Sequence, residues 1–473
     1  DQPRSRGLGD VYKRQPTPSE LDAFRGVGFR DVQLSKSYGV AIDAAGDVVQ
    51  WGAGYDSDAP QPHKTLTGLD LVKVQPCGAK IYALSRSGYV YVFPSERTKQ
   101  RILSSWTGSN VEHVQLTAMD PATRRSGERF VDIAGGAHHL VALGRTGGVW
   151  TVPVDHLANE YGQLGYSSVS LSSGETRLEP RIVSNNAAND STLDTSIRYA
   201  TQLRPVPSLS GVAFSEIAAG TAHSVVRTAD GRVLTWGCNT HGQLGLGRIT
   251  CDTIAVPTEV AWPAPVVGRS ARCTKIAAGG ATTLFVIYSR GAPTPTDDDT
   301  PRRPVAGERI DVLAAGSGQR GSLGNGQRSQ TCGIPVRVKA ISGLQEYSEA
   351  KRSMQPIDVH ALTVGDEGQC AATMTAPAID TEIRRDVYVW GANDANQLGL
   401  GRKGNLAAPT LLALPVDAEK TRDSPVLNRV LLVERRERAK TFDESGHGST
   451  RNGTVAQTVV AGGDNMAVFG HIM

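Results

Sequence analysis

Small and apolar residues gather in seven short segments that recur along the chain, and each leads into a turn and a second apolar run. Aligned on their glycine position, the copies stand at residues 34, 76, 135, 220, 279, 365 and 462, with spacings of 42, 59, 85, 59, 86 and 97. This pattern predicts seven repeated units of about 60 residues, three of them lengthened by insertions. The segments, each expected to form a small-residue strand, are Val32–Ile42, Val74–Leu84, Ile133–Leu143, Ala218–Val226, Ala277–Phe285, Thr363–Ala372 and Val459–Val468.

Each unit continues through a tight turn into a return strand. Gly46, Gly88, Gly147 and Gly231 stand at four of these turns. Glycine supplies the positive φ that a tight hairpin needs, so the sequence predicts a β-meander in each unit.

The return strands carry the pattern Val-x-x-Trp-Gly, and a Gln-Leu-Gly motif follows. Trp150 and Gln163 are thirteen residues apart, so six residues are inserted between them. The pairs that are seven residues apart are Trp236/Gln243, Trp390/Gln397 and the worn copy Ala315/Ser322.

Seven stacked meanders would leave exposed sheet edges, and radial closure into a propeller removes most of them. Small residues suit strands that converge near the axis. We expect each tryptophan ring to pack between blades with its N–H on a carbonyl. We expect each Gln-Leu-Gly loop to bury its leucine and to tie backbone groups through the amide. The sequence therefore predicts an all-β, seven-bladed β-propeller.

The seventh unit reaches residue 473 before any return Trp-Gly, so we expect residues 16–30 to supply the missing outer strand. The predicted organisation is an N-terminal extension at 1–28 and a single propeller at 29–473. Within the extension, residues 1–15 are interpreted as a presequence remnant or as non-native sequence. Insertions are expected at about 98–128, 166–212, 289–308 and 403–454, either solvated or disordered in part or contacting a partner.

Composition excludes several classes of function. The net charge of +3 is too small to indicate nucleic acid or an anionic membrane as the partner. None of the six cysteines forms a C-x-x-C pair, which argues against a zinc site and for reduced thiols. No run of 18 apolar residues exists, so no membrane span is predicted.

Candidate catalytic residues all have a structural interpretation. His138, His139, His223 and His241 lie on repeat positions, where we expect them to bond backbone in blade turns rather than to converge on a metal. Ser224 follows a histidine, but no carboxylate recurs at a triad-like position. We therefore predict no catalytic, cofactor-binding or metal-binding residues, and a protein that is not an enzyme.

These motifs resemble the regulator of chromosome condensation repeat, whose family forms seven-bladed β-propellers. The resemblance covers roughly residues 29–470, and the motifs are complete at 214–247 and 385–401. The first two units depart from the pattern: Trp51 has no Gln-Leu-Gly partner, and Phe93 replaces tryptophan.

Within that family, Asp31–Gly52, Leu71–Gln75 and Ala83–Tyr91 look like the fungal-type mitochondrial members. Those are proteins of the inner membrane and matrix, linked to respiratory-complex assembly and mitochondrial biogenesis. The resemblance implies that a full-length member would carry an N-terminal targeting segment.

Three functional hypotheses follow. The first is a non-catalytic protein-interaction scaffold in the mitochondrial matrix or at the inner membrane. Its partners would be respiratory-complex or mitoribosome assembly components. The second is a guanine-nucleotide exchange factor for a small GTPase, with 289–308 as the contacting loop. A nuclear or cytoplasmic location is the alternative to the mitochondrion, and the third hypothesis is chromatin or RNA binding. Its one local support is the basic cluster Arg435–Lys440, which glutamates dilute.

Overall fold

The computed structural model is all-β, with short 3-10 helices at Asp22–Phe24, Arg97–Lys99 and Pro207–Leu209. Residues 1–20 lie outside the described part of the chain, as do most of 166–212 and 289–308. The structure describes residues 21–105, 108–118, 128–166, 195–247, 249, 252–263, 270–290, 307–349, 351–375, 383–413, 431–443 and 450–472.

Six antiparallel meanders of four strands succeed one another along the chain. The first three are β1 (Phe29–Leu34), β2 (Gly39–Asp43), β3 (Val48–Trp51), β4 (His63–Leu66); β5 (Leu71–Cys77), β6 (Lys80–Ser85), β7 (Val90–Pro94), β10 (Val114–Gln115); and β12 (Phe130–Gly135), β13 (His139–Gly144), β14 (Val149–Pro153), β15 (Gln202–Pro205). The next three are β16 (Phe214–Ala219), β17 (His223–Thr228), β18 (Val233–Cys238), β19 (Thr253–Glu259); β20 (Ser270–Gly279), β21 (Thr282–Arg290), β22 (Arg309–Gly316), β23 (Val336–Arg337); and β26 (Val359–Val364), β27 (Gln369–Thr375), β28 (Ile383–Gly391), β29 (Leu406–Leu411).

The last part of the chain joins the sixth meander to the first. Strand β30 (Leu431–Lys440) pairs with both β28 and β31 (Thr450–Gly462), and β31 pairs with β32 (Asn465–Ile472). The range 403–454, expected as an insertion, thus contains β29, β30 and the start of β31. A parallel bridge from Phe29 to His471 joins β1 to β32.

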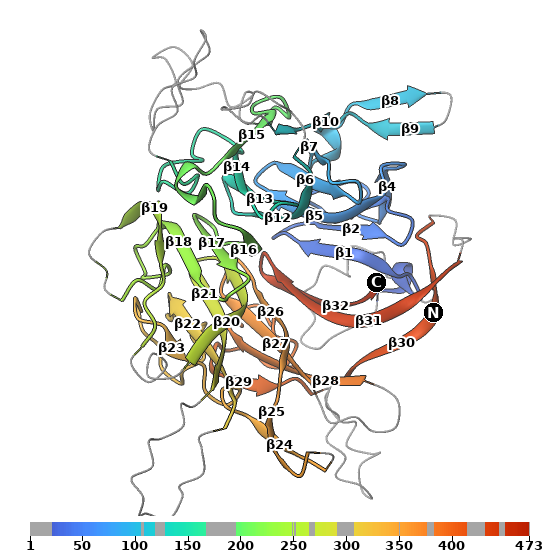
Figure 1. Cartoon of the computed structure of the whole chain (residues 1–473). Coiled ribbons are helices and arrows are strands. Elements are labelled where there is room, and N and C mark those ends of the chain that lie inside the picture. The colour runs from blue at the N-terminus through green and yellow to red at the C-terminus, as the bar shows by residue number, and fades with distance from the viewer. Residues whose placement is uncertain are drawn as a thin grey trace, which may run out of the picture.

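The units are arranged radially (Figure 1). The first strand of each unit contacts the first strand of the next, in the order β1, β5, β12, β16, β20, β26 and β31, and β31 contacts β1 again. These strands converge so closely that two glycines are required. A Cβ at Gly279 would overlap the carbonyl of Val364, and one at Gly462 would overlap the carbonyl of Leu34. Small residues therefore occupy the converging strands for the reason that the sequence indicated.

The hairpin turns also agree with the sequence. Gly46, Gly88, Gly147 and Gly231 have φ values of 92°, 86°, 88° and 94° between the second and third strands of their units. Residues with a Cβ rarely adopt such angles. Glycine at these positions therefore sets the tight meander.

Two expectations about the repeat were wrong. The recurring segment, such as Ile133–Leu143, is not one strand but two, β12 and β13, joined by a turn at the glycine pair. The alignment was also one residue short in the first three units. Both Gly136 and Gly220 donate their N–H to the carbonyl of the histidine three residues on, which makes Gly136, not Gly135, the equivalent of Gly220. A β-bulge early in the first strand of each of the six meanders adds an unpaired residue, which motif spacing does not reveal.

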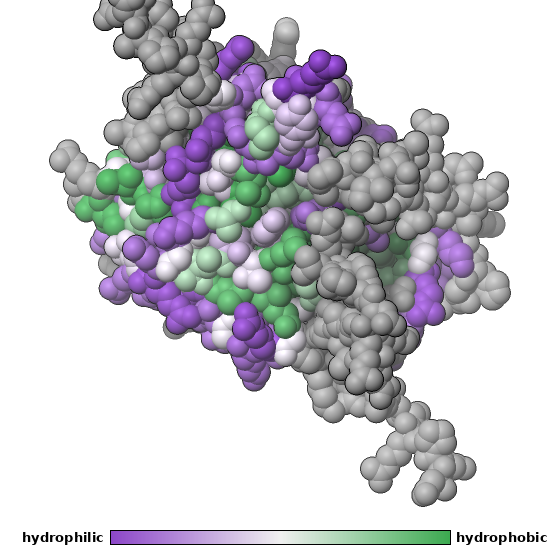
Figure 2. Space-filling model, turned by 90° about the horizontal axis from the view of Figure 1, so that it is seen from below, coloured by the Kyte–Doolittle hydropathy of each residue, from purple (hydrophilic) through white to green (hydrophobic). Residues whose placement is uncertain are grey.

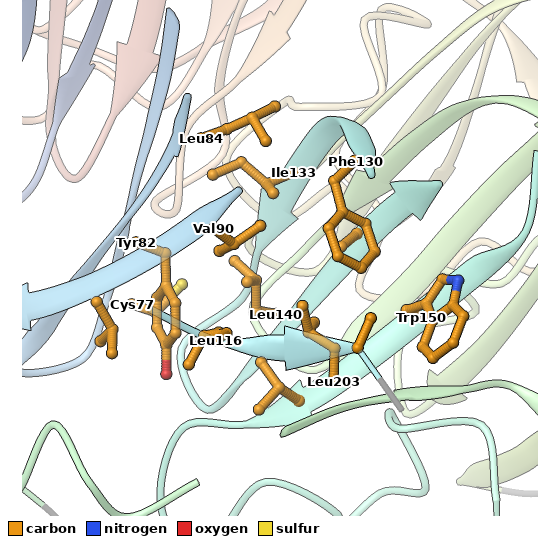
Figure 3. Close-up of a cluster of buried hydrophobic side chains, with 14 of the residues drawn as sticks. Cys77, Tyr82, Leu84, Val90, Leu116, Phe130, Ile133, Leu140, Trp150 and Leu203 are labelled. Atoms are coloured by element: carbon orange, nitrogen blue, oxygen red, sulfur yellow. The ribbon is translucent and has the colours of Figure 1, made fainter. Parts of the chain in front are cut away.

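The core is divided into clusters that lie between neighbouring blades. The cluster in Figure 3 joins the second and third blades: Tyr82 and Val90 of one pack with Phe130, Leu140 and Trp150 of the other. Leu116, in the segment between β10 and the third blade, and Leu203, on β15, complete the cluster. Hydrophobic burial therefore holds each blade to the next rather than filling one central core.

The N-terminal segment does not form the continuous outer strand expected of residues 16–30. Residues 16–20 lie outside the described chain, and Asp22–Phe24 form a 3-10 helix. Val27 makes a parallel bridge with Lys440 of β30, and the Gly28 N–H donates to the Lys440 carbonyl at 3.1 Å. The described residues thus attach the segment to β30 and β32 through isolated bridges.

Phe24 packs at this junction between three separate parts of the chain. Its ring centroid lies 5.2 Å from that of Phe29, 4.9 Å from that of Trp51 and 5.7 Å from that of Phe442. We expect Phe24→Ala to lower the free energy of unfolding by about 1–2 kcal/mol, less than for a fully buried ring because Phe24 is half-buried. Urea denaturation measures this. Asp22→Ala, at a side chain 90% exposed in the same helix, is the control and should change stability little. Equal effects of the two substitutions would contradict the packing role.

Candidate interaction surfaces

The repeated tryptophans hold blades together. Trp236 is fully buried, and its Nε1–H donates to the Gln163 carbonyl of the preceding blade at 2.9 Å. Trp390 repeats the arrangement, with its Nε1–H on the Ser322 carbonyl at 2.8 Å. The predicted role of the tryptophan N–H is confirmed at both complete copies of the motif.

The Gln-Leu-Gly loops are self-contained turns. Each glutamine Oε1 accepts the backbone N–H two residues earlier, at 2.9 Å for Gln163, 2.9 Å for Gln243 and 2.8 Å for Gln397. The leucine that follows each of them is buried. As expected, the glutamine side chains are hydrogen-bonded within their own loops and the leucine side chains are buried, so little of either is accessible to a ligand.

His139 is bonded to the next blade, not to backbone as expected. Its Nε2 lies 2.9 Å from Ser224 Oγ, and Ser224 Oγ donates to the Gln163 carbonyl at 3.1 Å. Because the serine proton is used on that carbonyl, the serine oxygen accepts, and His139 carries its proton on Nε2. Ser224 is therefore a bridge between blades and has no nucleophile geometry.

The same pair of hydrogen bonds recurs one blade further on. His223 Nε2 lies 2.8 Å from Thr283 Oγ1, which donates to the Gln243 carbonyl at 2.7 Å. Among the described residues, neither His139 Nδ1 nor His223 Nδ1 has a hydrogen-bond partner, and both rings are fully buried. Burial lowers the pKa of His139 to about 3, assisted by the charges of His223 and His138, and burial lowers the pKa of His223 to about 4. Both rings are therefore neutral near pH 7.

The other two repeat histidines lie nearer the surface. His138 Nδ1 lies 2.7 Å from Asp155 Oδ2, and His241 Nδ1 lies 3.0 Å from Thr240 Oγ1. No three His, Cys, Asp or Glu side chains in the described residues are grouped to hold a metal ion. The four histidines lie in two neighbouring blades, and within the described residues they are not grouped as one metal site.

Charged side chains occupy equivalent positions on five successive first strands: Asp31, Lys73, Asp132, Glu216 and Lys275. Lys73 Nζ lies 2.5 Å from Asp132 Oδ1. Burial lowers the pKa of Lys73, but the carboxylates of Asp132 and Asp31 outweigh it and the net shift is upward. Burial raises the pKa of Asp31, against the opposing charge of Lys73. Lys73 and Asp132 thus pair with each other, whereas Glu216 Oε2 accepts from Arg227 Nε at 2.7 Å within its own blade.

Two long connections meet beside the second and third blades. One includes Arg97–Lys99 and the hairpin of β8 (Ile102–Ser105) and β9 (Gly108–Val111), and the other returns through residues 195–201. Strand β11 (Thr117–Ala118) pairs in parallel with β15. Motif spacing could not show that the insertions 98–128 and 166–212 converge, since tertiary structure alone brings them together.

The connection between the fifth and sixth blades carries a projecting hairpin, which the sequence did not single out. It consists of β24 (Gln345–Ser348) and β25 (Ser353–Pro356), and it extends at the lower edge of Figure 1. Tyr347 and Met354 face each other across its strands, with 61% and 52% of their surface exposed. Glu346 and Gln355, on the opposite face, are half-buried.

The polarity of this hairpin is inverted, because the apolar pair is exposed to solvent whereas the polar pair is half-buried. Tyrosine and methionine are enriched in the cores of protein interfaces. Figure 2, which shows the molecule from below, has apolar residues in several patches interrupted by polar ones. The hairpin is thus a candidate contact surface. Two apolar residues on short strands are too weak a pattern to predict this hairpin from the sequence.

The described residues contain no helix long and apolar enough to cross a membrane. The basic cluster Arg435–Lys440 lies on β30, and its side chains through Ala439 are outside the described residues.

Comparisons with known proteins agree with the repeat. A family model described as the regulator of chromosome condensation (RCC1) repeat matches residues 230–286, and a second model of the same description matches 214–243. Among solved structures, Prp20p from Saccharomyces cerevisiae superimposes with a TM-score of 0.53 and 16% identity, covering 93% of this chain and 81% of that one. That structure was reported with the binding of Prp20p to Gsp1p and histones.

Two curated relatives illustrate the range of the match. Protein FMP25, mitochondrial, from Saccharomyces cerevisiae is 23% identical over 410 residues, which is 82% of this chain and 61% of that protein. The human E3 ubiquitin-protein ligase HERC2 is 26% identical over 240 residues, which is 44% of this chain and 4% of HERC2. The chain thus spans less than two thirds of the length of each.

Proposed function

We propose that this chain, a β-propeller built from RCC1 repeats, is a non-catalytic protein-interaction scaffold of mitochondria. It would assist assembly of a respiratory complex or of the mitochondrial translation apparatus. The repeated polar residues are bonded between blades or within loops, so they support the fold. The contact surfaces are then the connecting segments, since loops on a rigid framework commonly carry binding function.

The observation that carries this proposal is the inverted hairpin β24–β25. Exposing Tyr347 and Met354 to water while half-burying Glu346 is unfavourable for the isolated chain. The arrangement becomes favourable when a partner covers the apolar pair. Buried aromatic anchors of this kind contribute a large share of binding energy in protein complexes.

Mitochondrial location is proposed from the relative FMP25, whose printed name places it in mitochondria. The partners we propose are inner-membrane respiratory-complex or mitoribosome assembly components in the matrix or at the inner membrane. Nuclear or cytoplasmic location remains the alternative, and it accompanies the exchange-factor hypothesis below.

We also propose that β31 and β32 are the core of a seventh blade, so that residues 29–473 form one propeller with the N-terminal segment closing it. The closed circuit of first strands supports this, as do the bridges of Val27 and Phe29 to the last strands.

Proximity labelling in intact cells, with the full-length protein fused to a biotin ligase, tests the scaffold proposal. We expect labelled inner-membrane, ribosomal or assembly-factor proteins. For Tyr347→Ser/Met354→Ser we expect their labelling to fall roughly tenfold, since hot-spot truncation costs more than about 1 kcal/mol per residue. Val256→Ser is the matched control, because Val256 is 59% exposed on β19 of another blade. Mitochondrial neighbours that are equally labelled by the double variant would refute the hairpin as the contact.

A guanine-nucleotide exchange factor is the second candidate. Its support is the fold shared with Prp20p, which binds Gsp1p. The loop 289–308, expected as the contact, lies largely outside the described residues. A nucleotide-release assay against mitochondrial and cytosolic small GTPases tests this candidate, and release that is not accelerated for any of them excludes it.

A further inference from the structure

The convergence of two insertions creates a pocket of about 390 Å³ beside the second and third blades. One wall is the segment after β7, with Lys99 and Arg101. The other is the segment that returns to β15, with Ser196, Ile197 and Arg198. The two walls are fixed to each other, because Thr117 N–H donates to the Thr201 carbonyl at 2.9 Å. The cavity is therefore part of the fold.

Positive charge predominates in this pocket. Three cations, Lys99, Arg101 and Arg198, line it together with one acid, Glu112. That acid is already held by Arg198 Nη2 at 3.0 Å, and Lys99 Nζ lies 3.2 Å from Glu96. Among the described residues, Arg101 forms no ion pair of its own. With Glu96 included, three cations stand beside two carboxylates, so the excess positive charge is one and Arg101 carries it.

The lining also defines the class of ligand. Among the described residues, no aromatic side chain lines it on which a nucleotide base could stack. Guanidinium and ammonium groups beside a hydroxyl suit a small oxyanion, which Arg can bind through two parallel hydrogen bonds. The mouth is open to solvent, so an oxyanion carried on a polypeptide can enter.

We propose that this pocket binds an oxyanion, either a carboxylate of an acidic peptide segment or a phosphate, with Arg101 as the principal anchor and Lys99 and Arg198 as flanking cations. The inference deepens the proposed scaffold function and rests on it, because it supplies a second contact, separate from the Tyr347 hairpin. Arg198 holds Glu112 aside, which leaves Arg101 open to the incoming anion.

Purified full-length chain and a fluorescein-labelled, N-acetylated hexaglutamate peptide provide the test, with anisotropy as the readout. We expect binding at low salt that weakens as ionic strength rises from about 0.02 to about 0.15 M, since screening acts on exposed charges. Lys99→Gln/Arg101→Gln should weaken it at least fivefold. Arg232→Gln is the matched control, because Arg232 is a comparably exposed arginine paired with Glu259 on another blade. It should bind as wild type does, and thermal unfolding establishes that each variant is folded.

Inorganic phosphate distinguishes the two sources of the oxyanion. Stabilisation by phosphate above that by chloride at equal ionic strength, lost in the double variant, assigns the pocket to phosphate. Peptide binding without a phosphate effect assigns it to carboxylate. The proposal is overturned if neither probe binds, if the double variant binds like wild type, or if a hexalysine peptide binds equally well. Such a failure leaves the scaffold proposal standing, because the hairpin variant and proximity labelling test that separately.

Discussion

Trp236→Ala should lower the free energy of unfolding by about 3–5 kcal/mol, as expected for a fully buried large aromatic residue. The ring packs in a cluster that unites Val141 and Val149 of the third blade with Phe214 and Ile217 of the fourth. Its removal leaves a cavity between blades and also deletes the bond to the Gln163 carbonyl. Urea denaturation followed by tryptophan fluorescence and circular dichroism measures the loss. A change below about 1 kcal/mol would contradict the blade-packing role.

Phenylalanine substitutions separate the hydrogen bond from the packing. In Trp236→Phe the Gln163 carbonyl keeps its bond from Ser224 Oγ. In Trp390→Phe the Ser322 carbonyl keeps only a weak thiol contact, Cys370 Sγ at 3.7 Å. An orphaned buried carbonyl costs about 1–3 kcal/mol. Trp390→Phe should therefore be the more destabilising of the two substitutions. The reverse order would show that the hydrogen bonds left to the two carbonyls do not determine the difference in stability.

Acid should destabilise the propeller well above the pH at which its carboxylates titrate. A histidine whose pKa is lowered on folding binds fewer protons in the folded state than in the unfolded state. Its contribution to stability is therefore complete above the unfolded pKa of about 6.5 and is lost as pH falls toward the folded values of about 3 for His139 and about 4 for His223. Lowering the pH from 7 to 5 should therefore lower the free energy of unfolding by about 2 kcal/mol for each of the two histidines.

A single substitution isolates this effect from other titrating groups. The buried Asp31 and Asp366 have raised pKa values, mainly through burial, and act in the opposite direction. Their effect is common to wild type and variant. Between pH 7 and pH 5, the free energy of unfolding of His223→Gln should fall by roughly half as much as the two buried histidines together make it fall in wild type. This holds however much the substitution itself destabilises the protein at pH 7. A variant with an unchanged pH dependence would contradict burial of a neutral ring.

The sequence predicted the features that a local pattern encodes. Positive φ at Gly46, the Trp236 N–H bond and the buried leucine of Gln-Leu-Gly each depend on a few neighbouring residues, and each is confirmed. The small residues of the converging strands were also predicted, because only such residues fit at the closest approach of these strands. Repetition made these local signals visible above the background of the chain.

What the sequence missed depends on contacts distant in the chain or on single residues. The third unit has two adjacent glycines, and only the hydrogen bond from Gly136 N–H to the His139 carbonyl shows which of them matches Gly220. His139 bonds Ser224, 85 positions away, which no spacing rule anticipates. The pocket needs Arg101 and Arg198 from two insertions that share no pattern. Roles that depend on neighbouring residues were therefore predictable, whereas the bond between His139 and Ser224 and the candidate contact surfaces were not.

The central claim is that the repeats build the framework and the unrepeated segments bind partners in mitochondria. Quantitative proximity labelling with the full-length protein, comparing wild type with Tyr347→Ser/Met354→Ser, tests it most directly. We expect inner-membrane, ribosomal or assembly-factor neighbours whose labelling falls about tenfold in the variant, while the variant's unfolding midpoint stays within a few degrees of wild type. Neighbours confined to nuclear small GTPases and histones, labelled equally by both proteins, would contradict it.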